Sequence, residues 1–186
     1  MRQKNSKPIG NPQAGEDVCA GHALGFPLRT ELGFSPIENL TLDVFRAVCE
    51  VYTSGSAQPW EIAFKIAEEN LGVIDGPLVV ARTTALLRAL RSERKIGFSY
   101  LSIGCQHVSP DELAVAGLLK AARTGDERGI QRGLMLALDR SKTSARTQAA
   151  ARALAALQLQ IGPPASDAPA GNDDFQTQTV QAVYLH

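Results

Sequence analysis

The apolar positions of this chain recur every three to four residues across most of its length, which is the period of an α-helix. After Pro36 the pattern places one apolar stripe on a helix that is broken by the polar run of residues 53–58. The side chains of that stripe are Leu40, Val44, Val48 and Val51, widened by Phe45, Cys49 and Tyr52. The pattern therefore predicts helical rather than strand structure from this point onward.

Two short stretches mark the starts of helices with the same residue types. Ser35-Pro36-Ile37-Glu38 and Ser109-Pro110-Asp111-Glu112 each place a serine cap, then a proline at the first helical position and a glutamate at the third. The serine and glutamate side chains can then satisfy each other's backbone N–H groups, an arrangement known as a capping box. Both stretches therefore predict a helix that begins at the proline.

The remaining helix boundaries follow from proline, glycine and aspartate. We expect one helix after the turn Thr124-Gly125-Asp126, because apolar residues recur at helical spacing behind it. The other expected helices cover residues 59–72, 75–95 and 143–159. Six helices with short polar connections predict an all-α fold, either a compact bundle or an orthogonal array.

Composition divides the chain into a helical domain and two tails. Hydrophobic residues make up 44% of the chain but aromatic residues only 5%, so that Ala and Leu dominate the expected core. Residues 1–36 and 162–186 are rich in small, polar and proline residues without a sustained period. We therefore expect a flexible N-terminal arm over 1–36, one helical domain over 37–161 and a flexible C-terminal tail over 162–186.

Overall charge and cysteine content limit the class of protein. Lys+Arg and Asp+Glu number 19 each, so net charge predicts no particular partner. No run of about 18 apolar residues predicts a membrane span, and the N-terminus lacks the apolar segment of a secretory signal. Three widely spaced cysteines argue against a disulfide framework. These features favour a reduced, cytoplasmic protein.

Charge is unevenly distributed along the chain. Residues 38–75 contain two basic and seven acidic residues, whereas residues 76–152 contain thirteen basic and six acidic ones. The helix expected over 75–95 has a polar, basic face and follows a turn after another helix, which has the outline of a helix-turn-helix. One alternative is therefore a DNA-binding regulator, with the candidate residues Arg82, Thr84, Arg88, Arg91 and Lys95.

The cysteines and histidines supply a second alternative. Cys105 and His107 lie one residue apart just before the second capping box, and Cys19 and His22 lie two residues apart in the expected arm. Two sulfurs and two imidazole nitrogens are a donor set that zinc accepts, but the close spacing of the second pair departs from that of structural zinc sites. Cys105 beside His107 is also a candidate redox thiol, so this alternative is a thiol- or metal-dependent sensor.

No catalytic motif is present. The chain has no G-x-S-x-G, P-loop, H-E-x-x-H or dinucleotide-binding pattern, and its paired acids are explained by helix starts and solvated faces. The interpretation that we favour is a non-catalytic regulatory or protein-interaction module, with a protein partner or self-association and without an obligate cofactor.

Overall fold

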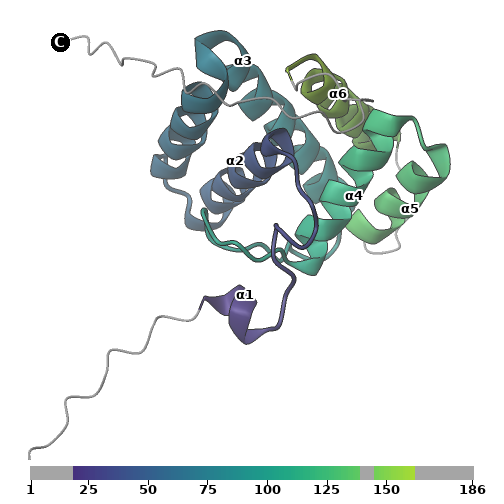
Figure 1. Cartoon of the computed structure of the whole chain (residues 1–186), viewed down its shortest axis with the longest axis horizontal. Coiled ribbons are helices and arrows are strands. Elements are labelled where there is room, and N and C mark those ends of the chain that lie inside the picture. The colour runs from purple at the N-terminus through teal and green to yellow at the C-terminus, as the bar shows by residue number, and fades with distance from the viewer. Residues whose placement is uncertain (1–18, 139–144, 162–186) are drawn as a thin grey trace, which may run out of the picture.

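The computed structural model describes residues 19–138 and 145–161, which form an all-α protein (Figure 1). No strand occurs in these residues, and no helix among them is long and apolar enough to cross a membrane. The helices are α1 (Ala20–Ala23), α2 (Pro36–Ser54), α3 (Gln58–Glu93), α4 (Pro110–Thr124), α5 (Glu127–Ala137) and α6 (Ala145–Ile161). The predicted all-α class is confirmed.

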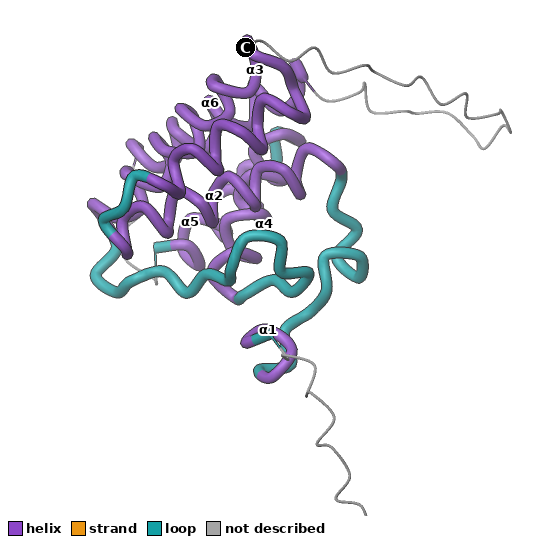
Figure 2. The backbone as a smooth tube through the Cα atoms, turned by 90° about the vertical axis from the view of Figure 1, so that its left-hand side faces the viewer, coloured by secondary structure: helices purple, strands orange, loops and turns teal. Residues whose placement is uncertain are grey.

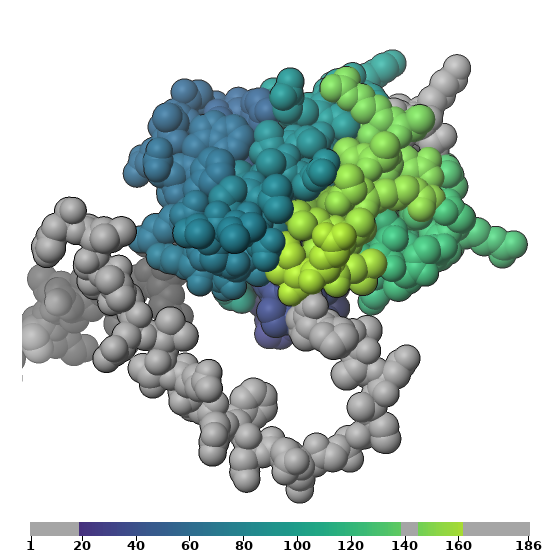
Figure 3. Space-filling model, turned by 90° about the horizontal axis from the view of Figure 1, so that it is seen from above, coloured from purple at the N-terminus to yellow at the C-terminus, as the bar shows by residue number. Residues whose placement is uncertain are grey.

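The five long helices pack around one apolar core. Helix α2 lies against α3, α4 lies against α5, and α6 packs on both α3 and α4. Seen from above, α3 and α6 lie side by side on one face of the molecule (Figure 3). The core is built mainly from Leu, Val and Ala, as the composition predicts, and its fully buried members include Val44, Leu86, Leu118, Leu134 and Leu154. Burial of these side chains is the main source of stability for the bundle.

Both capping boxes are present where the sequence predicts them. Ser35 and Ser109 each accept the backbone N–H of the glutamate three residues later, and that glutamate accepts the N–H of the serine. Helices α2 and α4 therefore begin at Pro36 and Pro110. The signals that fix these two starts are local, which is why the sequence alone locates them.

The helices expected over 59–72 and 75–95 both occur within α3, as two helical halves that meet at a break in the helical geometry at Gly72. Gly72 interrupts the helical geometry with φ 80° and ψ 174°, a conformation open to glycine because it has no Cβ. The second half begins directly after Gly72, so the turn between the two halves is shorter than the sequence suggests. Gly76 then packs so closely that a Cβ there would lie 2.7 Å from the carbonyl carbon of Ala67. This close packing of the two halves explains why they follow each other without a loop.

Residues 19–35 differ from the flexible arm expected over 1–36. They contain the short helix α1 and an isolated antiparallel β-bridge between Leu28 and His107. Helix α1 lies at one end of the molecule, outside the group of long helices (Figure 2). We call residues 19–35 the docked segment. Residues 1–18 of the expected arm, and the tail expected over 162–186, lie outside the described residues.

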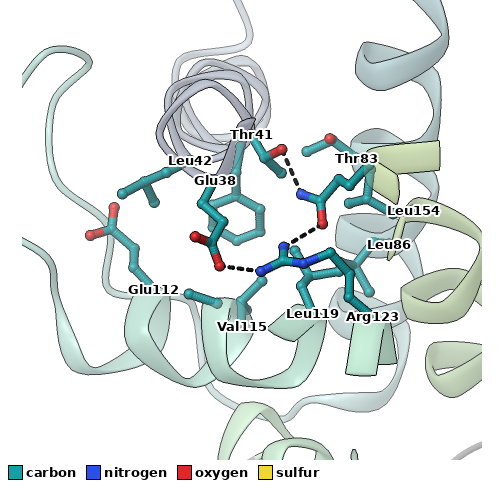
Figure 4. Close-up of a pocket in the computed structure, with 13 residues that line it drawn as sticks. Glu38, Thr41, Leu42, Thr83, Leu86, Glu112, Val115, Leu119, Arg123 and Leu154 are labelled. Carbon is teal, nitrogen blue, oxygen red and sulfur yellow. Dashed lines mark hydrogen bonds and ion pairs between the residues drawn. The ribbon is translucent and has the colours of Figure 1, made fainter. Parts of the chain in front are cut away.

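A polar network crosses the core between α2, α4 and α6. Arg123 pairs with Glu38 and donates to Oε1 of Gln158 at 2.8 Å, and Gln158 donates to Oγ1 of Thr41 at 2.8 Å (Figure 4). Burial of Glu38 acts to raise the pKa of its carboxyl group, but hydrogen bonds from the Ser35 N–H and from Arg123 outweigh this effect and lower the pKa. The adjoining cavity measures about 20 Å³, enough for about one water molecule, so this network serves packing rather than ligand binding.

Candidate metal centre

Two cysteines and a histidine from distant parts of the chain converge at the docked segment. Cys19 directly precedes α1, whereas Cys105 and His107 lie in the connection between α3 and α4, residues 94–109, which we call the ligand loop. The Sγ atoms of Cys19 and Cys105 are 3.4 Å apart. Nδ1 of His107 lies 3.3 Å from the Cys19 sulfur and 4.0 Å from the Cys105 sulfur. Three donor atoms of the kind that bind transition metals therefore face one another.

These separations resemble those of a tetrahedral zinc site. Zn–S bonds of about 2.3 Å and Zn–N bonds of about 2.0 Å, at tetrahedral angles, place two sulfurs about 3.8 Å apart and a sulfur about 3.5 Å from a nitrogen. The three observed distances each lie within about 0.5 Å of these values. All three donor atoms lie within 4.8 Å of one another. The cluster can hold one small metal ion without a large rearrangement.

His22 lies beside this cluster as a fourth candidate ligand. Its ring centroid is 5.6 Å from that of His107, and the two rings are nearly perpendicular at 84°. His22 is exposed on α1 and is not among the three donors that lie within 4.8 Å of one another, so ligation by His22 would require its side chain to turn toward them. The two cysteines and two histidines singled out in the sequence are thus brought to one place by the fold.

Backbone pairing holds the docked segment against the ligand loop. The N–H of Arg29 donates to the carbonyl of Gln106 at 2.8 Å, and the N–H of Val108 donates to the carbonyl of Pro27 at 2.9 Å. These two bonds flank the bridge between Leu28 and His107. The candidate ligand His107 therefore belongs to the pairing that fixes the position of the docked segment.

Gly21 allows the docked segment to approach the ligand loop closely. A Cβ atom at this position would lie 2.5 Å from Cβ of His107 and 2.9 Å from Cδ1 of Leu101. Carbon atoms that are not bonded to each other do not approach this closely, so either the docked segment or the ligand loop would have to move. Close packing therefore requires glycine at position 21, between the candidate ligands Cys19 and His22.

Arg46 fixes the ligand loop from inside the protein. It lies on α2 with no solvent exposure, and its guanidinium donates to the carbonyl oxygens of Cys105 and His107, each at 2.6 Å, and of Ser102 at 3.2 Å. The same side chain forms a two-point ion pair with Glu112, at 2.7 and 2.9 Å. One buried cation therefore orients the backbone of both candidate ligands in the loop, the kind of outer-shell support that metal sites use.

Glu112 and Asp43 extend this support to both sides of the site. Glu112 also accepts hydrogen bonds from the backbone N–H groups of Leu101, at 3.0 Å, and of Ser109, at 2.8 Å. These bonds hold the ligand loop on both sides of Cys105 and His107. Asp43 on α2 pairs with Arg29 of the docked segment at 2.5 and 3.0 Å. A buried charged side chain needs a partner of opposite charge. The pairs of Arg46 with Glu112 and of Arg29 with Asp43 meet this need.

The three cysteines have different electrostatic surroundings. The Cys19 thiol accepts backbone hydrogen bonds, chiefly from His22, and interacts with Cys105, which lowers its pKa. Desolvation and the neighbouring Cys19 raise the pKa of Cys105. Burial in the core raises the pKa of Cys49 strongly, so this thiol is inert. Cys19 and Cys105 are each partly exposed, and they are the two thiols at the candidate metal centre.

The residues of the DNA-binding alternative lie elsewhere, on α3 and just beyond its end. Arg82 and Arg88 are exposed, whereas Thr84 is half-buried and donates to the carbonyl of Val80 at 2.7 Å. The guanidinium of Arg91 lies over the ring of Tyr52, 4.0 Å from its centroid. Lys95 and Arg91 line one hollow of about 260 Å³, and Arg88, Arg91 and Arg146 line a neighbouring one of about 350 Å³. This basic surface is separate from the cysteine and histidine cluster.

The supporting residues Arg46, Gly21, Arg29 and Asp43 were not anticipated from the sequence. Arg46 falls next to Phe45 on the otherwise apolar side of the first long helix, and a charged residue there signals a buried partner. The other three carry no local signal, because their role depends on contacts between distant segments.

Comparison with protein-family models, with curated proteins and with solved structures gave no match to this chain, so the function proposed for it rests on the geometry of the site.

Proposed function

We propose that this protein is a metal-dependent regulatory module in which a zinc ion, bound by Cys19, His22, Cys105 and His107, joins the docked segment to the ligand loop. The observation that carries the proposal is the convergence of donor atoms from segments 86 residues apart, with a sulfur–sulfur separation of 3.4 Å. The proposal combines the regulatory role favoured from the sequence with the metal-dependent alternative.

The donor set favours zinc over other biological cations. Thiolate and imidazole together suit zinc, whereas magnesium and calcium prefer oxygen ligands. Four protein ligands complete the tetrahedral shell and leave no position for a substrate, as in structural zinc sites. This arrangement supports a non-catalytic role, and the thiols would stay reduced and able to bind metal in the cytoplasm.

The ion would control whether residues 19–35 remain docked. Without it, the docked segment is held to the ligand loop and α2 by two backbone bonds, the pair of Arg29 and Asp43, the packing at Gly21 and, at its C-terminal end, the bonds of Phe34 and Ser35 to α2. Loss of the ion would favour release of the segment and expose the surface of the ligand loop. A protein partner that binds only one of these two states would then respond to metal availability.

Metal content tests the proposal directly. The full chain, purified without chelator and exchanged into metal-free buffer after loading with Zn²⁺, should retain one zinc per chain. Cys105→Ser should retain less than a tenth of this amount, because one ligand is lost. Cys49→Ala is the matched control and should bind as the unaltered chain does, because Cys49 lies in the core. Equal zinc content in Cys105→Ser and the unaltered chain would contradict the proposal.

A second candidate function, nucleic-acid binding, is supported by the basic surface around Tyr52. Within residues 19–138 and 145–161, no acid lies within ion-pair distance of Arg88, Arg91 or Lys95. Unpaired cations on one surface suit phosphate groups. If this surface binds a DNA duplex, affinity should fall steeply with salt, and Arg88→Ala with Arg91→Ala should weaken it. Lys65→Ala is the control, since Lys65 is an exposed basic residue that lies before the break at Gly72 and pairs with Glu69. Absence of binding at low salt would eliminate this candidate.

A further inference from the structure

We propose that the metal centre is also a redox switch, in which a peroxide oxidises Cys19 and Cys105 to a disulfide and expels the metal ion. This inference rests on the proposed metal site and concerns its regulation. It also predicts that oxidation and metal removal have opposite effects on the docked segment.

The geometry brings the two sulfurs close to bonding distance. Their separation is 3.4 Å, and a disulfide bond measures about 2.0 Å, so the sulfurs need to approach by only about 1.4 Å. Cys19 directly precedes α1, a helix of four residues at one end of the molecule (Figure 2). Cys19 and Cys105 are residues of intermediate exposure, with Cys105 the more buried of the two within the cluster, whereas Cys49 lies in the core.

The chemistry is a two-electron oxidation with peroxide as the oxidant. One thiolate sulfur attacks a peroxide oxygen, the O–O bond breaks, and a sulfenic acid and one water form once a proton is taken up from solvent. The second sulfur then attacks the sulfenic sulfur, forms the S–S bond and displaces hydroxide, which takes up a second proton and leaves as water. The zinc ion keeps its charge and is released, because two of its four ligands no longer bind it.

The disulfide would change what holds the docked segment in place. A chelator removes the only strong connection between Cys19 and Cys105, so the segment can leave the ligand loop. Oxidation replaces the metal by a covalent bond between the same two residues, so the segment stays attached while His22 and His107 lose the ion. The protein would thus have three states: metal-bound and docked, metal-free and released, and oxidised and cross-linked.

The experiment treats the zinc-loaded full chain with hydrogen peroxide and follows two quantities. A chromogenic chelator measures released zinc, and peptide mass mapping after alkylation of the remaining thiols identifies the disulfide. We expect one zinc released for each disulfide formed between Cys19 and Cys105, with alkylated Cys49, and recovery of zinc binding after reduction. Cys49→Ala should behave identically. The oxidised chain should resist limited proteolysis within residues 19–35 more than the chelated, reduced chain does.

The outcomes separate the switch from the proposed metal site. A chain that holds zinc before treatment but keeps it in peroxide, or that releases it without a disulfide between Cys19 and Cys105, would overturn the redox switch alone. A chain that holds no zinc before treatment would overturn the proposed function, and the metal-release step with it. The zinc content measured before peroxide is added distinguishes the two failures.

Discussion

The helical bundle and the docked segment are held in place by different physical means. Helices α2 to α6 bury a continuous apolar core, with many side chains that have no solvent exposure. Residues 19–35 instead contact the rest of the protein mainly through polar groups. These contacts are two backbone bonds to the ligand loop, the pair of Arg29 and Asp43, the close contact at Gly21, the cysteine and histidine cluster, and bonds of Phe34 and Ser35 to the start of α2. The bundle depends on hydrophobic burial, whereas the docked segment depends on polar and thiol groups that, under the proposed function, would respond to metal and oxidant.

This difference indicates how a small helical protein can carry a segment whose position depends on solution conditions. The ligand loop belongs to both regions, because Arg46 connects the backbone of Cys105 and His107 to Glu112 at the start of α4. The bundle thus holds two of the four candidate ligands in position, while the docked segment brings the other two. Substitutions in the two regions should separate the contribution of the bundle from that of the docked segment. Their expected effects decrease in the order Arg46, Leu134, Gly21, Arg29.

Arg46→Met should have the largest effect, because it damages both regions. It leaves Glu112 as an unpaired buried charge and should lower the free energy of unfolding by about 3–5 kcal/mol, measured by urea denaturation. It should also weaken zinc binding by about 10–100-fold, since the carbonyls of Cys105 and His107 lose their donor.

A double variant separates these two effects of Arg46. Adding Glu112→Gln to Arg46→Met removes the unpaired charge and keeps an oxygen for one of the two backbone N–H groups, of Leu101 and Ser109, that Glu112 accepts with separate oxygens. Part of the stability should return, whereas zinc affinity should stay low. Full recovery of zinc affinity would show that Arg46 does not orient the ligand loop.

Leu134→Ala should affect the bundle alone. Leu134 is fully buried on α5, which contributes no residue to the metal centre, so its truncation should cost about 2–5 kcal/mol of unfolding free energy. The folded variant should still bind one zinc with unchanged affinity, measured by competition with a chelator. A loss of zinc affinity in folded Leu134→Ala would mean that the two regions are not separable.

Gly21→Ala should affect the docked segment alone. The added Cβ would clash with His107, so zinc affinity should fall by at least about tenfold while the unfolding free energy of the metal-free bundle changes by less than about 1 kcal/mol. Gly97→Ala is the matched control, because Gly97 lies in the ligand loop with open space around its Cα. Equal effects of the two substitutions would contradict a specific close contact at Gly21.

Arg29→Lys should have the smallest effect. Lysine keeps the charge but loses the two-point pair with Asp43, so docking should weaken by about 1 kcal/mol. In the metal-free protein this should appear as faster proteolysis within residues 19–35, whereas the zinc-bound protein should be protected as before. An increase in proteolysis that is the same with and without zinc would indicate that the ion does not contribute to docking.

The sequence predicts local features of this fold better than long-range ones. The starts of α2 and α4 depend on four adjacent residues each, and both are found where Ser35 and Ser109 predict them. The break at Gly72 is predicted as a helix end, whereas the close packing of Gly76 on Ala67, which brings the two halves of α3 together, is revealed by no local pattern.

The candidate site shows the same difference between local features, which the sequence predicts, and long-range contacts, which it does not. Its four residue types can be singled out in the sequence, yet Cys19 and Cys105 are 86 residues apart and their spacing predicts no shared site. Residues 1–36 as a whole are rich in Pro, Gly, Asn and Gln without a sustained period, which predicts a flexible arm that includes residues 19–35. Their position instead depends on the bridge between Leu28 and His107 and on the pair of Arg29 and Asp43, which only the folded structure brings together.

The central claim, that four side chains from two regions bind one ion, is tested most directly by X-ray absorption at the zinc edge. The zinc-loaded chain should show two sulfur ligands at about 2.3 Å and two nitrogen ligands at about 2.0 Å. In His22→Ala, one nitrogen should be lost or replaced by oxygen, and both sulfurs should remain. A shell of oxygen and nitrogen without sulfur, or a spectrum unchanged in His22→Ala, would contradict the account.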